Sequence, residues 1–399
     1  MTNAALQSKK LTHVDLFAGP GGIATGFQAA GFSSTIAVEY VETCVETYVA
    51  NHPSTPVIHK DVREVTARDL KGNGIHSADV VTAGIPCETF STAGSSSRSF
   101  YDDRQVLFRE AIRIADLVQA KVLLLENVPG LLTKTLKKGS KDLVIDQIEK
   151  ELALAGFDTV QRMVLNAADY GVPQRRERLF VVATRGGRGI LVPKVAPKKI
   201  LVREAFADLP VARSADSEDD GVAYLGKTNA YTRVMRDSSF WNTSIQARPM
   251  LTYHQSPRHR AATIERFGLL EPGEGLKDLF EKYSPKEVRE LQKRRVLPKK
   301  WYIQRNRRLV SSSQSPTVTS HCLDELVHPL RDRALTVREV ARLQSFPDWY
   351  QFVGGPTICP HNDFRQDKYE QIGDAVPPLL ARAVADSIRE FLTGSEFFE

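Results

Sequence analysis

The sequence has few of the residues and patterns that mark specialised protein classes. Its 399 residues include four cysteines, which lie far apart and form no Cys-x-x-Cys pair. A disulfide framework and a structural zinc site are therefore not expected, and reduced thiols in the cytosol are the simplest interpretation. Cys359 and His361 make a poor metal pair, because no second pair stands at ligand spacing. We expect no metal site.

Long apolar runs are also missing. No segment approaches the roughly 20 apolar residues that a membrane-crossing helix needs, and residues 1–10 lack the apolar core of a signal peptide. We therefore expect a cytoplasmic protein with no membrane partner, nucleoid-associated if the source is bacterial. The sequence also lacks G-x-G-x-x-G, which disfavours a dinucleotide-dependent oxidoreductase.

The composition indicates an ordinary folded protein of more than one part. The hydrophobic share of 42% suffices for a sizeable core, and the length suits one large domain with a smaller one. The formal net charge of +6 fits an anionic partner such as nucleic acid but does not require one.

The first half of the chain alternates apolar runs with helical periodicity. This alternation predicts an α/β fold with a parallel sheet covered on both faces, in which ligands bind beyond the carboxyl ends of the strands where strand order reverses. The predicted strands span residues 13–17, 35–39, 57–62, 78–83, 121–125, 159–166 and 179–184, and the main predicted helices span 23–30, 42–50, 106–118, 143–154, 336–346 and 378–391.

The alternation stops after Gly186 and helical periodicity returns near residue 336. We predict a large domain over 1–185, a small domain over 186–360 and a return to the large domain over 361–399. The small domain contains a basic stretch, residues 286–308, in which Trp301 and Tyr302 are embedded. This stretch is either a nucleic-acid contact or a solvated basic helix.

Polar or glycine-rich features follow three successive predicted strands. Residues 19–22 read Gly-Pro-Gly-Gly after the first, Glu39 ends the second and Asp61 ends the third. A glycine turn before a helix lets a ligand approach backbone N–H groups, and a carboxylate at a strand end accepts ribose hydroxyls. Taken alone, the glycine turn is equally a plain turn, and each carboxylate is better explained as a solvated strand end, but three such features in succession favour a nucleotide-type ligand.

Candidate catalytic groups follow later strands. Cys87 stands after Pro86 in a loop, where it is either a nucleophile or a small buried hydrophobe. Glu126 directly follows an apolar strand, so poor solvation should raise its pKa, which suits a proton donor; a structural cap is the alternative. Arg176 and Arg178 share one face of an extended segment and suit anion or carbonyl binding, unless they belong to a surface basic run.

Together these segments resemble the cytosine-5 DNA methyltransferase family of prokaryotic type. Six motifs occur in family order across almost the whole chain. They are Asp15 to Gly22, Pro86-Cys87 with Phe90-Ser91, Glu126-Asn127-Val128, Gln174 to Arg178, Arg333 to Asp348, and Ile372 to Pro378. The resemblance implies a Rossmann-like S-adenosylmethionine-dependent fold with a smaller target-recognition domain. The catalytic and cofactor-binding domain would then be the large domain, 1–185 with 361–399, and the target-recognition domain would be the small one, 186–360.

The resemblance also implies site roles. Cys87 would attack carbon 6 of cytosine, Glu126 would bind N3 and the exocyclic amine, Arg178 would bind O2, and Arg176 would support the catalytic loop. S-adenosylmethionine would be held by Phe17, Gly19, Gly21, Gly22, Glu39 (ribose), Tyr40, Asp61 (adenine amine), Val62, Pro86, Asp374, Ala375 and Val376. DNA would be contacted by Ser91, Lys299, Lys300, Arg305 and Arg307.

The implied reaction is methyl transfer to carbon 5 of a cytosine flipped out of a specific duplex sequence. From what is usual in the family, we also expect a restriction–modification role and a cognate restriction endonuclease that acts on the same site. We expect the protein to be a monomer. Methylation of tRNA and a DNA-binding protein without catalysis are the competing hypotheses. Glu88, Ile85 and Asp374 depart from the usual residues of their motifs, which puts the backbone contacts near Glu88 in doubt.

Overall fold

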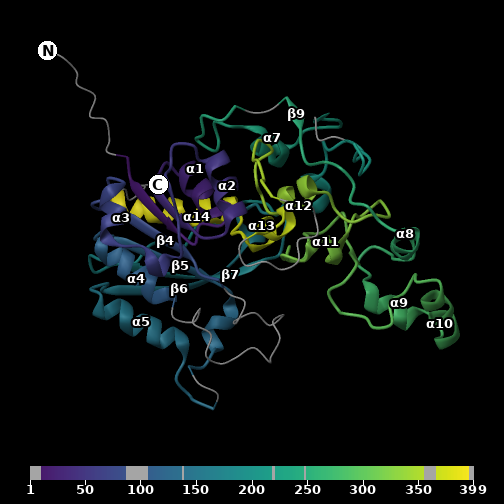
Figure 1. Ribbon diagram of the computed structural model, residues 1–399, viewed down its shortest axis with the longest axis horizontal. Helices are drawn as coiled ribbons and strands as arrows, with labels where there is room; N and C mark the ends of the chain where they lie inside the picture. Colours follow the sequence, from purple (N-terminus) through teal and green to yellow (C-terminus); the bar gives the residue numbers. More distant parts are fainter. Residues whose placement is uncertain are drawn as a thin grey trace.

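The computed structural model describes residues 10–86, 107–136, 139–217, 221–246, 249–354 and 365–394. Its centre is a seven-stranded sheet with the order β3-β2-β1-β4-β5-β7-β6 (Figure 1). The strands are β1 (Thr12–Leu16), β2 (Ser33–Glu39), β3 (Val57–His59), β4 (Val80–Gly84), β5 (Val122–Asn127), β6 (Thr159–Asn166) and β7 (Glu177–Thr184). The predicted α/β architecture is confirmed.

Helices cover both faces of the sheet (Figure 1). The helices that belong to this part are α1 (Gly22–Ala29), α2 (Glu42–Asn51), α3 (Ala67–Gly72), α4 (Leu107–Leu117), α5 (Val144–Leu154) and α14 (Pro378–Thr393). Apolar side chains of α3, α4 and α5 fill one core layer, and those of α1 and α14 fill the layer on the other face. β5 is buried along its whole length, since it is packed from both sides.

One strand direction differs from the prediction. β1 to β5 pair in parallel as predicted, but β7 runs antiparallel to both β5 and β6, so the sheet is mostly parallel. The connection from β6 to β7 has only a short 3-10 helix (Ala167–Tyr170) and a left-handed turn at Gly171. A parallel return needs a longer crossover, so this short connection enforces the antiparallel pairing.

A second correction concerns β3, which ends at His59 and not at residue 62. Asp61 instead caps a 3-10 helix (Val62–Glu64) by accepting a hydrogen bond from the backbone N–H of Arg63. An aspartate is a preferred N-cap, which explains why the extended segment stops before it.

The remaining chain forms short elements beside the sheet (Figure 1). They are α6 (Val202–Ala205), β8 (Val222–Ala223), α7 (Ala230–Arg236), β9 (Met250–Leu251), α8 (Ala261–Gly268), α9 (Leu276–Lys282), α10 (Pro285–Lys293), β10 (Arg307–Arg308), α11 (Cys322–Glu325), β11 (Leu326–Val327), α12 (Val337–Leu343) and α13 (Lys368–Asp374). The predicted loss of strand–helix alternation is confirmed. None of the helices described is long and apolar enough to cross a membrane.

Candidate active site

The carboxyl ends of four neighbouring strands carry the predicted site residues to one edge of the sheet. β1 and β4 are adjacent, and strand order runs outward from them in opposite directions. Phe17 follows β1, Glu39 ends β2, Pro86 follows β4, and Glu126 is the penultimate residue of β5. These residues therefore lie where the strand order of the sheet reverses, which is the position at which open α/β sheets bind their ligands.

The reversed direction of β7 brings the arginines to this same edge. Its first residues pair with the end of β5, with Phe180 opposite Glu126 and Leu179 opposite Asn127. Arg178 thus stands beside Glu126, and its Nε lies 2.9 Å from Oε1 of the carboxylate. In a parallel strand the same arginines would lie at the opposite edge, far from Glu126.

Glu126 has the environment that the sequence predicts. Its side chain is 9% exposed, and burial raises the pKa of its carboxyl while the cations of Arg178 and Arg176 act in the opposite direction. Gly84 pairs with Glu126 across the sheet, and a Cβ atom at Gly84 would lie 3.9 Å from Oε2. The start of the Pro86 loop therefore lies beside the carboxyl.

Two predicted residues lie outside the described residues. They are Cys87 and Ser91, and the departure at Glu88 falls in the same gap. Just before this gap, the side-chain amide of Asn127 donates to the carbonyl of Ile85 at 3.4 Å. Pro86, the last described residue before the gap, is half-buried at the edge that holds Glu126.

The glycine-rich turn is tied to the end of β2. The backbone N–H of Gly19 donates to Oε2 of Glu39 at 2.7 Å, while the N–H groups of Tyr40 and Val41 donate to Oε1, both at 2.8 Å. Burial raises the pKa of Glu39, and these three hydrogen bonds oppose that rise. The carboxylate is fixed in place, and Tyr40 beside it stays partly exposed.

The close approach of two backbones explains one glycine of the turn. A Cβ atom at Gly22 would lie 2.3 Å from the carbonyl oxygen of Val376. Ala375 and Val376 therefore pack directly on the start of α1, although more than 350 residues separate them. Asp374 is exposed, and its Oδ2 accepts from the side-chain amide of Gln366 at 3.0 Å.

Arg176 joins the sheet to this C-terminal turn. It is 1% exposed, and its guanidinium donates to the carbonyls of Val318, Gly373 and Ala375. These three hydrogen bonds hold backbone, so they show how the turn is fixed and leave the predicted support of the catalytic loop untested.

Asp61 and Val62, both predicted to hold the cofactor, are engaged by other residues of the protein. The guanidinium of Arg63 donates to both carboxylate oxygens of Asp61, at 3.0 and 2.6 Å. These hydrogen bonds lower the pKa of Asp61. Val62 is buried in the core, and its carbonyl accepts from Arg113 at 3.0 Å. A ligand of the Asp61 carboxylate would have to share it with Arg63.

Several residues that organise the site were given no role from the sequence. The hydroxyl of Tyr350 donates to the carbonyl of Pro20 in the glycine turn and lies 3.4 Å from Nε2 of His52. A Cβ atom at Gly21 would lie 2.7 Å from that hydroxyl. No local sequence pattern could reveal this contact, because 330 residues separate Tyr350 from Pro20.

A pair of glutamines also connects distant motifs. The amide of Gln344 donates to the carbonyls of Ile372 and Ala375, and its oxygen accepts from Gln174 at 2.5 Å. The side-chain oxygen of Gln174 in turn accepts from the N–H of Val318. Both side chains are fully buried, so this part of the Gln-x-Arg-x-Arg segment is structural.

The predicted DNA-contacting residues of the small part of the protein are exposed to different degrees. Lys299, Lys300 and Arg305 are exposed, and Arg305 pairs with Asp324 at 3.3 Å. Arg307 is half-buried and donates to the carbonyl of Gly273 at 3.3 Å. The two lysines are therefore the more available cations.

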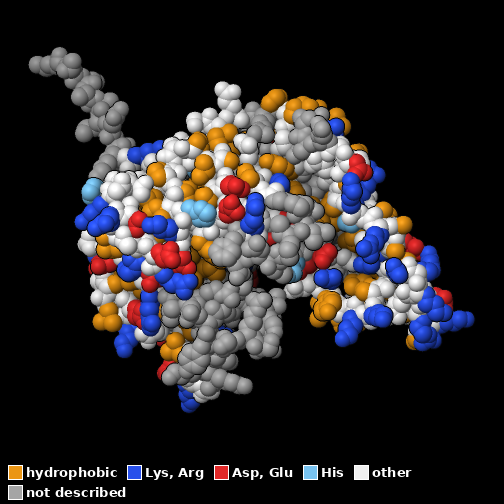
Figure 2. Space-filling view, viewed as in Figure 1, with side chains coloured by type: hydrophobic (Ala, Val, Ile, Leu, Met, Phe, Trp, Pro, Cys, Tyr) orange, Lys and Arg blue, Asp and Glu red, His pale blue; other side chains and the backbone are white. Residues whose placement is uncertain are grey.

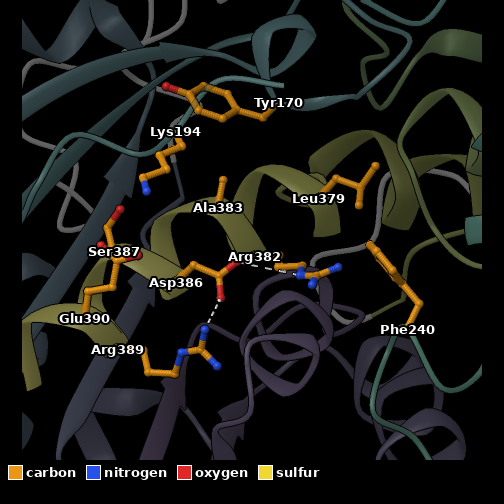
Figure 3. Close-up of a pocket in the computed structure, with 10 residues that line it drawn as sticks. All are labelled: Tyr170, Lys194, Phe240, Leu379, Arg382, Ala383, Asp386, Ser387, Arg389 and Glu390. Carbon is orange, nitrogen blue, oxygen red and sulfur yellow. Dashed lines mark ion pairs between the residues drawn. The ribbon is translucent and has the colours of Figure 1, made fainter. Parts of the chain in front are cut away.

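A cavity of about 420 Å³ lies along α14 (Figure 3). Asp386 stands between Arg382 and Arg389, at 3.7 and 3.3 Å, and Tyr170, Lys194 and Phe240 close the other sides. Of the predicted site residues that the structure describes, none lines this cavity. Its guanidinium groups are already paired with Asp386, so we assign it no part in the site.

Comparison with known proteins identifies the family. Residues 11–390 match the model of the C-5 cytosine-specific DNA methylase family. The chain is 33% identical over 385 residues to the type II methyltransferase M.DdeI of Desulfomicrobium norvegicum, with 94% of this chain and 88% of that protein covered. It is 31% identical to the type II methyltransferase M1.HphI of Haemophilus parahaemolyticus, with 96% and 88% covered.

Solved structures support the fold. A crystal structure assigned as a prophage-encoded DNA modification methyltransferase of Escherichia coli superposes with a TM-score of 0.71 at 22% identity, covering 96% of this chain and 99% of that one. The Dnmt2 methyltransferase of S. pombe superposes with a TM-score of 0.55 at 15% identity, with 96% and 99% covered. Because the family model matches nearly the whole length of the chain and the similar methyltransferases cover most of it, the chain belongs to the C-5 cytosine-specific DNA methylase family.

Proposed function

We propose that this DNA (cytosine-5-)-methyltransferase takes its methyl group from S-adenosylmethionine and modifies one recurring duplex sequence as the modification half of a restriction–modification system. The observation that carries the proposal is the convergence of the glycine turn, Glu39, Pro86, Glu126 and Arg178 at one edge of the sheet. The type II methyltransferases to which the chain is similar support the modification role.

The glycine turn and Glu39 fit the methyl donor. Gly19 has a φ of +53°, and no described atom lies within 4 Å of a Cβ built there, so a ligand can approach its backbone. Three backbone N–H groups occupy three of the roughly four acceptor sites of the Glu39 carboxylate, which leaves one site on Oε2 for a ribose hydroxyl. The exposed ring of Tyr40 offers a flat surface beside it. Phe17, Gly21, Gly22, Asp61, Val62, Pro86 and residues 374–376 would complete the pocket. When bound, S-adenosylmethionine supplies an electrophilic methyl group on a sulfonium.

Glu126 and Cys87 would activate the base together. Carbon 5 of cytosine is a poor nucleophile, and addition of the Cys87 thiolate to carbon 6 makes it enamine-like. Charge then builds at N3, where a protonated Glu126 donates a hydrogen bond or a proton. Burial keeps Glu126 protonated at higher pH than an ordinary glutamate, because it raises the pKa of the carboxyl, and this suits the task. Carbon 5 would then accept the methyl group, with the sulfonium leaving as a neutral thioether, and loss of the carbon-5 proton to a base would expel Cys87.

Arg178 would hold both the base and the catalytic carboxyl. Its Nε engages Glu126, and its fork of N–H donors leaves further groups for the O2 oxygen of cytosine. The target atom is hidden in stacked DNA, so the cytosine has to be flipped out to reach Glu126 and Arg178, as enzymes that modify a base within a duplex require. Arg176 would keep residues 373–375 seated behind the pocket.

The recognition part would be the small domain, residues 186–360. We propose that the basic residues Lys299, Lys300, Arg305 and Arg307 position the duplex through phosphates. The protein would act as a monomer in the cytoplasm, on nucleoid DNA, beside a restriction endonuclease that cuts the same sequence. Trapping on duplex DNA that contains 5-fluorocytosine tests the chemistry, because the fluorine blocks the final elimination. A covalent adduct with DNA and none with tRNA is expected; an adduct with tRNA alone would move the function to RNA.

A further inference from the structure

The net positive charge of the chain comes from one small segment. Residues 277–308 contain twelve Lys and Arg against four Asp and Glu, a net of +8, whereas the whole chain carries +6. The rest of the chain is therefore slightly negative. Figure 2 shows Lys and Arg side chains gathered over the surface of the part that bears α9 and α10. An anionic partner would be drawn to this part first.

This part has its own core, from which an exposed segment extends. Helices α8, α9 and α10 pack around a small cluster of Phe267, Leu270, Leu276, Leu279, Leu297 and Val327. Residues 299–305, which follow the cluster, are all exposed. Trp301, Tyr302 and Ile303, here called the apolar tip, are 40%, 60% and 63% exposed. Consecutive large apolar side chains exposed in this way indicate a surface that another molecule covers.

Cations surround the apolar tip. Nζ of Lys277 lies 5.9 Å from the ring centre of Trp301, and Cζ of Arg305 lies 5.5 Å from that of Tyr302. Lys299 and Lys300 directly precede the tip. Glu281 and Asp324 pair with Lys277 and Arg305, at 3.2 and 3.3 Å, but the two lysines at 299 and 300 add further positive charge. The covering molecule must therefore combine negative charge with flat apolar surface, as a duplex does with its phosphates and its bases and sugars.

We propose that the apolar tip enters a groove of the substrate duplex, where Trp301, Tyr302 and Ile303 lie against base edges and sugars. Lys299 and Lys300 bind the phosphates that border the groove. Apolar side chains used in this way spread or unstack a base step, and the deformation depends on sequence, so the tip contributes to specificity as well as affinity. This inference rests on the proposed action of the protein on duplex DNA.

The distribution of tryptophans allows a direct test. The chain has three tryptophans, and Trp241 and Trp349 are buried, so acrylamide quenching of intrinsic fluorescence reports mainly on Trp301. The native chain is titrated with a short duplex carrying its methylation site, with binding followed in parallel by the anisotropy of a dye on the DNA. We expect DNA to change the emission and to protect it from acrylamide, and Trp301→Phe to lose both responses.

Variants separate the apolar contact from the charge. In Trp301→Ala/Tyr302→Ala/Ile303→Ala we expect DNA affinity to fall about tenfold or more, with the salt dependence unchanged because no cation is removed. Leu154→Ala removes a 79% exposed side chain of α5 and serves as the matched control with unchanged affinity. All four substituted side chains are exposed, so the fold should be kept, and unchanged unfolding midpoints check this.

The outcomes distinguish this inference from the proposed function. Methylation and saturable binding by the native chain, with tryptophan emission and acrylamide access unchanged by DNA, would overturn the role of the tip and leave the function standing. Protection of Trp301 that grows with protein concentration in the absence of DNA would assign the tip to a second copy of the chain, and would also overturn it. No methylation and no DNA binding by the native chain would remove the proposed function itself.

Discussion

Nε of Arg178 lies 2.9 Å from Oε1 of Glu126, and both side chains are largely shielded from water. The pair forms because β7 runs antiparallel to β5, which carries the start of one strand to the end of the other. Arg178 lowers the pKa of Glu126, while burial raises it by more. Removing either partner should therefore change how activity depends on pH.

Substitutions at this pair should separate the two roles. Glu126→Gln should reduce kcat/KM by about 100-fold or more, because the amide cannot pass a proton to N3. In the native chain, activity should fall as pH rises through the raised pKa of Glu126, since only the protonated carboxyl donates. Arg178→Gln removes the cation that lowers this pKa, so the alkaline limb of its pH profile should move to higher pH. A limb that stays in place would show that Glu126 does not control it.

Tyr350 holds the glycine turn through the hydrogen bond from its hydroxyl to the carbonyl of Pro20. Loss of this hydrogen bond in Tyr350→Phe should raise KM for S-adenosylmethionine about three- to tenfold with little change in kcat. Tyr231→Phe is the matched control, because it removes a buried hydroxyl that donates to the carbonyl of Arg342 and not to the turn. Equal KM values in the two variants would refute a positioning role for Tyr350.

Two glycines in helices should respond differently to an added methyl group. Gly22→Ala should lower the free energy of unfolding by about 1–3 kcal/mol, because the added Cβ would meet the carbonyl oxygen of Val376 at 2.3 Å. In Gly72→Ala no described atom lies within 4 Å of the new Cβ, so this variant should be neutral or slightly stabilised. Urea unfolding measures both, and equal stabilities would contradict the close seating of residues 375–376 on α1.

The salt dependence of DNA binding should report on the basic residues of the small part. Replacing Lys299, Lys300, Arg305 and Arg307 with glutamine should lower the slope of log affinity against log salt, by about 0.9 for each phosphate that is no longer neutralised. Most of the change should come from the two lysines, since Arg305 pairs with Asp324 and Arg307 donates to backbone.

The control for this experiment is Lys71→Gln/Lys150→Gln, which removes two exposed lysines of the catalytic part. Its slope should match that of the native chain, because neither lysine lies in the basic stretch. An unchanged slope in the fourfold variant would remove its four residues from the DNA interface.

The sequence predicted the layered fold and the strand-end positions of Glu39 and Glu126, because these depend on local periodicity and on the residue that follows an apolar run. It could not predict the direction of β7 from alternation alone, although the absence of a helical pattern between Asn166 and Glu177 was a usable signal. Asp61 caps a 3-10 helix by accepting from the backbone N–H of Arg63, two residues on, and a strand prediction does not consider such a local hydrogen bond.

Contacts between segments far apart in the chain could not be predicted from the sequence. The hydrogen bonds of Tyr350, Gln344 and Arg176 join segments that are far apart in the sequence and adjacent in the folded chain. Burial of Arg308 is a similar case. It belongs to the predicted basic stretch, yet it is 6% exposed and donates to the carbonyls of His328 and Arg331. Composition could not distinguish such structural arginines from exposed lysines.

The proposed function depends above all on methylation of cytosine at carbon 5 through Cys87. Bisulfite sequencing of DNA from a methylation-free bacterial host that expresses the native chain, beside a Cys87→Ala control, measures this reaction directly. We predict protected cytosines in one recurring sequence with the native chain and none with the control. Unprotected DNA from cells that contain folded, S-adenosylmethionine-binding native protein, or equal protection by Cys87→Ala, would contradict it.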